Sequence, residues 1–155
     1  MSKLNDILEF VKTRQTTLNL SVAGTVLTIV KRKLPKREET VDSPYMTTIS
    51  GAEVVAEVKR IAFKGKYLVP YVVEITLVTP NDKDELINLT DHATWLETTR
   101  GAYQVDLMMA AVGSIYKVEV IQNPFLDRAQ IKDGYDYTQV VLRVTTHETR
   151  LPAGP

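Results

Sequence analysis

Tyr67-Leu-Val-Pro-Tyr-Val-Val-Glu-Ile-Thr-Leu-Val-Thr79 is the stretch of this chain that decides its fold. Because successive side chains of a strand point to opposite faces, its alternating apolar residues predict a strand with one continuous apolar face. Those residues are Tyr71, Val73, Ile75 and Leu77. Val72 and Val78 add apolar side chains to the other face, so the strand is predicted to be covered on both sides rather than to form an edge.

The segments on either side of this strand predict its neighbours along the chain. An apolar segment that begins at Val54 is predicted to be a second strand, joined to the first by a turn at Lys64-Gly65-Lys66. A helix is predicted to open near Asn81, with apolar residues at steps of three and four that form one stripe. The stripe consists of Leu86, Leu89, Ala93 and Leu96. A helix with such a stripe fits on one face of a sheet.

The length and composition of the chain limit its class. Its 155 residues, 44% of them hydrophobic, predict a single domain over residues 1–150 with a C-terminal tail at 151–155. The 19 basic and 19 acidic residues cancel, which excludes a global field that would attract nucleic acid or acidic membranes. The absence of cysteine excludes disulfides, thiol catalysis and thiolate zinc sites. No apolar run approaches the roughly 20 residues that span a bilayer, so the protein is expected to be soluble.

The N-terminal residues predict an amphipathic helix. Ser2 is its expected N-cap, and Asp6 lies in the early turns, where a negative charge suits the helix dipole. The apolar residues of this helix are Leu4, Ile7, Leu8 and Val11. From Leu18 the period changes to two, which predicts a strand that bulges or bends at Gly24.

The segment after this strand is long and irregular. The range from Lys31 to Arg37 carries five basic residues in seven, and no clear periodicity follows through Gly51. About twenty residues without periodicity are uncommon in a compact domain, and such loops are usually functional or disordered. A projecting loop is therefore predicted.

Three further elements are predicted after the central helix. Residues 105–112 are predicted to form a short helical piece, and Ile115 to Gln122 a strand. After a turn at Asp133-Gly134, the last strand is predicted from Tyr135 to Thr146. This order has too few crossovers for a doubly wound parallel sheet. It indicates an α+β fold, a mixed or antiparallel β-sheet covered on one face by two helices, with a long projecting loop.

No set of residues predicts catalysis or a bound metal. The two histidines, His92 and His147, lack the spacing of a metal site and are predicted to lie on the surface. The acidic residues between Asn81 and Glu85 are similar to part of a calcium-binding loop, but the glycine and the distal glutamate of an EF-hand are missing. Acidic residues in the first turn of a helix are already explained by the helix dipole. With no Gly-x-Ser-x-Gly elbow and no phosphate-binding glycine loop, neither enzymatic activity nor a cofactor is predicted.

Two features could instead serve interactions. The basic residues of the irregular segment could contact phosphates, although Glu38 and Glu39 beside them favour a solvated or protein-contacting loop. Trp95 falls near the opposite side of the predicted helix from the apolar stripe, where it could pack against the first helix or anchor an interface. The candidate interface residues are Lys31, Arg32, Lys33, Lys36, Arg37, Tyr45 and Trp95.

The order of these elements resembles that of the tail terminator, or tail completion, proteins of long-tailed bacteriophages. An amphipathic N-terminal helix, a strand and a projecting segment with Pro35 and Pro44 come first. A hairpin ending in Val72-Val-Glu-Ile-Thr-Leu-Val78 and a helix ending in Trp95-Leu-Glu-Thr-Thr-Arg-Gly-Ala-Tyr103 follow, and a last strand covers Val140 to Thr146. The resemblance extends over nearly the whole chain and includes no diagnostic motif.

The resemblance implies a non-enzymatic structural virion protein without a cofactor. Such a protein would form a homo-oligomeric ring, hexameric in this family, that caps the tail tube and joins it to the neck. Its partners would be other copies of itself, the tail tube protein and neck or head-completion proteins. Nucleic acid would at most pass along the lumen of the ring, and no membrane would be involved.

The same resemblance implies a location in the tail or neck of the virion, and in the host cytoplasm during assembly. Two alternatives stand beside this interpretation. One is another neck or head-completion protein of the phage. The other is a small binding module that uses the basic loop at residues 31–37 to bind nucleic acid or a host protein.

Overall fold

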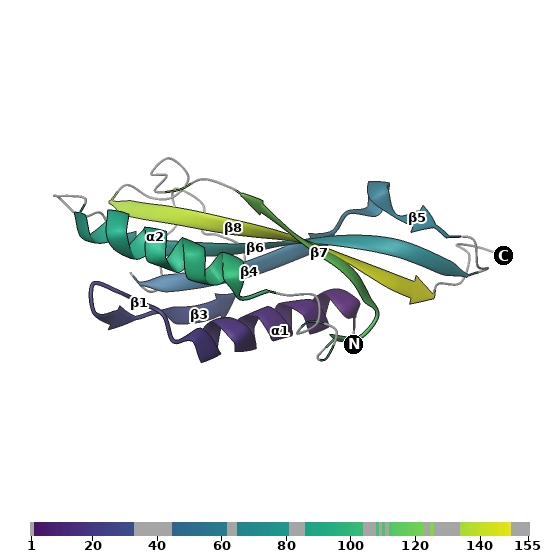
Figure 1. Cartoon of the computed structure of the whole chain (residues 1–155), viewed down its shortest axis with the longest axis horizontal. Coiled ribbons are helices and arrows are strands. Elements are labelled where there is room, and N and C mark those ends of the chain that lie inside the picture. Colours follow the sequence, from purple (N-terminus) through teal and green to yellow (C-terminus); the bar gives the residue numbers. More distant parts are fainter. Residues whose placement is uncertain are drawn as a thin grey trace.

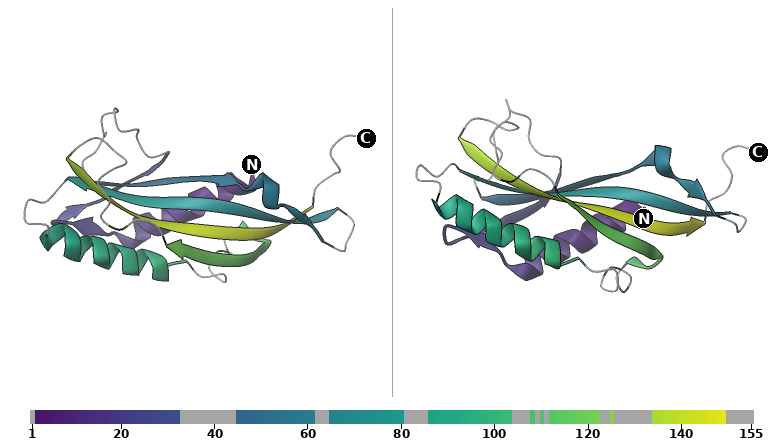
Figure 2. Two further views of the ribbon diagram at one scale, coloured as in Figure 1. Left: turned by 90° about the horizontal axis from the view of Figure 1, so that it is seen from above. Right: turned by 45° about the horizontal axis from the view of Figure 1, so that its top comes forward.

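The computed structural model describes residues 2–32, 45–61, 65–80, 86–103, 108, 110, 112–122, 125 and 134–149, and for residues 86–88 and 122 it describes the backbone alone. Two helices, α1 (Lys3–Leu18) and α2 (Leu86–Gly101), lie on the same face of a twisted sheet (Figure 1, Figure 2). The other elements are β1 (Ser21–Val22), β2 (Thr25–Val26), β3 (Thr28–Lys31), β4 (Met46–Glu53), the 3-10 helix η1 (Val55–Glu57), β5 (Lys59–Arg60), β6 (Lys66–Pro80), β7 (Ile115–Gln122) and β8 (Tyr135–Thr149).

Six strands form one mixed sheet with the order β3-β4-β6-β8-β7, and β5 pairs with one end of β6. β3 and β4 are parallel, whereas the other pairs of this sheet are antiparallel. β6 and β8 pair along their whole lengths, from Lys66 opposite Thr149 to Pro80 opposite Tyr135. The predicted α+β fold is therefore confirmed, and β6 is the central strand that the alternation at residues 67–79 predicts.

The residues that cap the two ends of α1 are suited to their positions. The Ser2 side chain accepts a hydrogen bond from the backbone N–H of Asn5 at 3.1 Å, as the predicted N-cap requires. Asn19 ends the helix in the left-handed conformation, with φ of 49°. Ile7 and Val11 form its buried stripe together with the polar Gln15. The amphipathic N-terminal helix is thus confirmed, and it extends through Leu18.

Gly24 lies in a tight turn rather than in a bulge of one long strand. β1 and β2 pair residues 21–22 with residues 25–26, which leaves Ala23 and Gly24 as the two loop residues. Both have positive φ, 51° and 76°, as the type I′ turn of a two-residue hairpin requires. The prediction of a single bent strand from Leu18 was wrong because a period of two is the same in a hairpin and in a continuous strand.

β4 covers residues 46–50, which were predicted to be irregular. Thr47 and Thr48 are buried on opposite faces of the sheet although their side chains are polar. An alternation of apolar and polar residues, from which a strand is predicted, is therefore missing from this segment. Ile49 pairs with Ile75 of β6 in the core. The rest of the predicted projecting loop, residues 33–44, lies outside the described residues.

The apolar segment from Val54 is not a long strand. It forms η1 and then the two-residue strand β5, whose Arg60 pairs with Tyr67. Val55 is 71% exposed, so none of the described elements buries this part of the segment. The predicted hairpin is therefore present only in a short form, and the long antiparallel neighbour of β6 on this side is β4.

The buried face of α2 differs from the predicted stripe. His92, Trp95, Leu96 and Thr99 are buried, at steps of three and four along the helix. Leu89 is 48% exposed, although it was predicted to lie in the stripe. An indole ring buries more apolar area than an isobutyl group, so the helix orientation that buries Trp95 is favoured even though it exposes Leu89.

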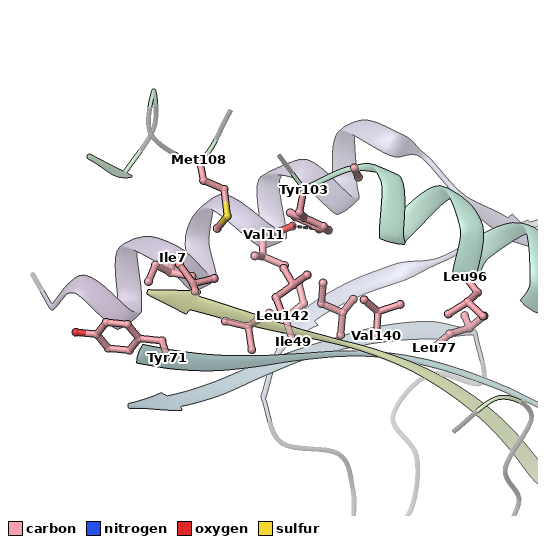
Figure 3. Close-up of a cluster of buried hydrophobic side chains, with 14 of the residues drawn as sticks. Ile7, Val11, Ile49, Tyr71, Leu77, Leu96, Tyr103, Met108, Val140 and Leu142 are labelled. Atoms are coloured by element: carbon pink, nitrogen blue, oxygen red, sulfur yellow. Dashed lines mark hydrogen bonds between the residues drawn. The ribbon is translucent and has the colours of Figure 1, made fainter. Parts of the chain in front are cut away.

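The main core lies between the two helices and one face of the sheet. In Figure 3, Leu96 of α2 points to Leu77 and Val140, while Ile7 and Val11 of α1 lie above Leu142 and Ile49. A smaller cluster occupies the other face of the sheet, where Met46, Val78 and Tyr137 lie side by side on β4, β6 and β8. Near Leu77 and Val78, both faces of β6 are therefore covered, as its sequence predicts.

Candidate assembly interface

The candidate interface residues do not form one surface. Trp95 is 1% exposed and belongs to the main core, so of the two positions predicted for it, packed within the subunit or anchoring an interface, the structure shows the first. Tyr45 is half-buried and packs against the same core, and its carbonyl accepts a hydrogen bond from the backbone N–H of Thr28 at 3.1 Å. Three further candidates, Lys33, Lys36 and Arg37, lie outside the described residues.

Two residues of the basic segment have partners within the subunit. The ammonium group of Lys31 forms an ion pair with the carboxylate of Glu9 and lies 3.4 Å from Oδ1 of Asn5. The hydrogen bond from Lys31 lowers the pKa of Glu9. A guanidinium nitrogen of Arg32 lies 3.6 Å from the sulfur of Met46. Lys31 therefore joins β3 to α1 rather than projecting with a free charge.

His92 is buried, so the prediction of a surface position was wrong for this histidine. Its Nδ1 lies 2.7 Å from the hydroxyl of Thr138 on β8, and its Nε2 lies 2.8 Å from the hydroxyl of Thr79 on β6. Burial lowers its pKa to about 4, against the opposing effect of Asp136 and Asp91. The imidazole is neutral at pH 7, with one ring nitrogen as donor and the other as acceptor.

The surroundings of His92 give it a structural role. It joins α2 to the two longest strands of the sheet and has no exposed nitrogen that could transfer a proton to a substrate. His147 is exposed, as predicted, and its ring contacts that of Tyr116 edge to face with centroids 4.9 Å apart. Neither histidine forms a catalytic arrangement with the residues described around it.

A second buried network joins the two helices. The hydroxyl of Tyr103, just after α2, donates to Oε1 of Gln15 at 2.6 Å and lies 3.4 Å from the carbonyl of Val11. Burial raises the pKa of Tyr103, so its hydroxyl stays protonated and donates. Arg14 adds a contact of 3.4 Å from Nε to the carbonyl of Ala102. This network joins α1 to the end of α2, and its Tyr103 and Gln15 side chains are buried.

The two edges of the sheet are candidate surfaces for contact with another chain. β3 and β7 are its terminal strands. On β7, Tyr116, Val120 and Ile121 are 55%, 40% and 41% exposed. Edge strands with exposed apolar side chains are templates for pairing with another chain. The sequence pattern predicts β7 as a strand, but it contains no signal for an edge position, because that depends on which strands pair.

Among the residues that the structure describes, no three or more His, Asp or Glu side chains lie close enough together to hold a metal ion. In the part of the chain that the structure describes, no helix is long and apolar enough to cross a membrane. No known protein-family model matches the chain, and a search of curated proteins finds no match.

Proposed function

We propose that this chain is a non-enzymatic structural virion protein, a tail terminator that forms a ring at the head–tail junction. The ring would cap the tail tube and join it to the neck. The observation that carries the proposal is the subunit architecture, a mixed sheet with both helices on one face and a different edge strand at each end. The order of elements along the chain resembles that of phage tail terminators, whose subunits are α+β.

The two ends of the sheet suit a ring. β3 and β7 differ in sequence and length, so contact between them joins the front of one copy to the back of the next. Contacts of this kind close into a ring when the rotation between copies divides a full turn. The polar networks at His92 and Tyr103 are buried and internally bonded, so they hold the subunit together.

The alternative of a binding module that uses residues 31–37 has less support. Its first residue, Lys31, is paired with Glu9, so its charge is partly neutralised within the subunit. No observation on the described residues favours this alternative specifically.

Native mass spectrometry of the purified chain tests the proposal. We expect a discrete species at a whole multiple of the 17.4 kDa subunit, six-fold for this family, and closed rings in electron micrographs. Immunogold labelling of the intact virion should then place the chain between head and tail. A protein that stays monomeric at all accessible concentrations, or label along the tail shaft instead, would contradict the proposal.

A further inference from the structure

We propose that neighbouring copies in the ring are joined by antiparallel pairing of β7 of one copy with β3 of the next, with Ile121 opposite Val30 and Glu119 opposite Arg32. The inference rests on the proposed ring and identifies the surfaces that form its subunit contact. The partner is therefore a second copy of this chain. The sheet would continue from subunit to subunit around the ring.

Both strands have an open side among the residues that the structure describes. β7 pairs with β8 alone, and β3 pairs with β4 alone. The outer backbone groups of such strands hydrogen-bond either to water or to a strand of another chain. The left view of Figure 2 shows β7 beside β8, on the side away from β6.

Strand direction favours this pairing. β3 runs parallel to β4, and each later step, from β4 to β6, β8 and β7, is antiparallel. After three reversals, β7 runs opposite to β3. A second copy in the same orientation therefore presents its β3 antiparallel to β7, and the new pair extends the ladder with the geometry that most of the sheet already has.

The two faces of the sheet restrict the register. Ile121 and Glu119 pair with Val141 and Arg143 of β8, on the face away from the helices. On β3, the residues on that face include Thr28 and Val30, because they pair with Met46 and Thr48. Directly opposite residues share a face, so only registers that differ by two residues are possible.

Charge selects one of these registers. With Ile121 opposite Val30, Glu119 lies opposite Arg32 and two apolar side chains also meet. With Ile121 opposite Thr28, Lys117 lies opposite Arg32, and like charges directly across a sheet are unfavourable. Both registers use residues of β7 beyond the bulge between Ile115 and Lys117, so the charges decide between them.

That bulge also disfavours pairing of β7 with β7 of another copy. A symmetric pair along the whole of both strands would place the irregular end of each strand against the regular end of its partner. Bulges interrupt a ladder and are one means by which proteins keep edges from pairing with themselves. The regular segment after the bulge, Lys117 to Gln122, is long enough to pair with the four residues of β3.

Because the chain has no cysteine, the contact can be tested by disulfide trapping. The test variant is Val30→Cys with Ile121→Cys in one chain. Within a subunit these positions are four strand spacings apart, about 19 Å, which is too far for a disulfide with its Cα separation of about 4.4–6.8 Å. Oxidation should therefore link copies to each other, giving a ladder on a non-reducing gel that ends at the copy number of the ring.

Two control variants make the result specific. Thr28→Cys with Ile121→Cys moves one partner by two residues on the same face and should give at least about ten-fold slower trapping, since the Cα separation then exceeds the disulfide range. Ile121→Cys alone should give no disulfide. Efficient dimer formation by this single variant would show symmetric β7 pairing and overturn the inference.

Charge reversal gives a second, independent measurement. Glu119→Arg should lower the fraction of rings at a given protein concentration, and Arg32→Glu combined with Glu119→Arg should restore it. Glu97→Arg, on the exposed side of α2, controls for charge reversal alone. Because Glu119 also lies opposite Arg143 and 3.5 Å from Lys117 in its own subunit, rescue by Arg32→Glu is the result specific to the contact. Rings that form without trapping and without charge rescue would overturn this contact while leaving the proposed function intact. Absence of rings in the unmodified protein would overturn both.

Discussion

At the residue scale, burial decides how much each side chain of α2 contributes to the free energy of unfolding. Trp95 is 1% exposed against the sheet, whereas Leu89, two turns earlier, is 48% exposed. Trp95→Ala should therefore lower the free energy of unfolding by about 3–5 kcal/mol, as expected for a truncated core aromatic residue. Leu89→Ala should cost less than about 1 kcal/mol. Urea unfolding of the two variants, with association followed in parallel, measures both effects.

The opposite ranking of these two variants would contradict the packing of α2. If Trp95→Ala melted like the unmodified protein and impaired only association, Trp95 would lie in an interface and not in the core. Trp95→Phe is a useful intermediate, since it keeps an aromatic ring in the site. It should lose less stability than Trp95→Ala.

His92 makes stability depend on pH. Its pKa is about 4 in the folded protein, while an ordinary histidine titrates near 6.5. Between these values the unfolded chain binds more protons than the folded chain, so the free energy of unfolding falls as the pH falls from 6.5 to 4. The loss from this residue is on the order of 3 kcal/mol, and it is complete below pH 4.

Urea midpoints at pH 7 and pH 4.5 test this expectation. His92→Gln should be less stable than the unmodified protein at pH 7, because it loses the bridge from Thr79 to Thr138. Its stability should change less between the two pH values, since no imidazole has to be protonated. His147→Gln, at an exposed position, is the matched control. An unchanged pH dependence in His92→Gln would refute this account.

At the scale of single elements, the hairpin of β1 and β2 has a residue that does not suit its turn. Ala23 has φ of 51°, a conformation that asparagine and glycine adopt more readily than alanine. Ala23→Asn should raise the free energy of unfolding by about 0.5–1 kcal/mol. It keeps the backbone N–H that donates to Asp91 of α2 at 2.8 Å. Thermal melting measures the gain.

Gly24→Ala provides the opposite test on the same turn. Nothing lies within 4 Å of the added methyl group, so any loss of stability reflects the φ of 76° and not a steric clash. A stabilising effect of this substitution would show that the turn is not of the type I′ form.

Gly51 allows α1 and the neighbouring strand to come close to β4. A Cβ at this position would lie 2.8 Å from the carbonyl oxygen of Val72 and 3.2 Å from a methyl group of Leu8. Gly51→Ala should therefore cost about 1–3 kcal/mol, because backbone must move to accept it. Gly101→Ala is the control, since nothing lies within 4 Å of the methyl group added there. Equal midpoints for the two variants in urea would contradict this packing.

At the scale of the whole molecule, charge limits the partners. The 19 basic and 19 acidic residues cancel, and Lys31 is paired with Glu9. The isolated protein should bind duplex DNA only weakly at physiological salt, within or below the non-specific range of about 10⁻⁴ to 10⁻⁶ M. Fluorescence anisotropy over a salt series measures this affinity. Sub-micromolar binding, lost on neutralising the basic residues of 31–37, would instead favour the binding-module alternative.

Local patterns in the sequence determined much of this fold. Alternation in residues 67–79, 115–122 and 135–146 predicted β6, β7 and β8, and Ser2 predicted the start of α1. These features depend on neighbours within one strand or one helical turn, so the chain itself carries the information. The mixed sheet and the two helices on one face followed from the order of such elements.

Only the tertiary structure decided which faces are buried and which strands lie at the edges. The buried stripe of α2 includes His92 because Thr79 and Thr138, from distant strands, satisfy its two ring nitrogens. β4 is a core strand because Ile49 and its threonines meet β6, although its own sequence lacks a clear apolar alternation. Both outcomes depend on contacts between residues far apart in the chain. The periodicity of a single segment gives no information about such contacts.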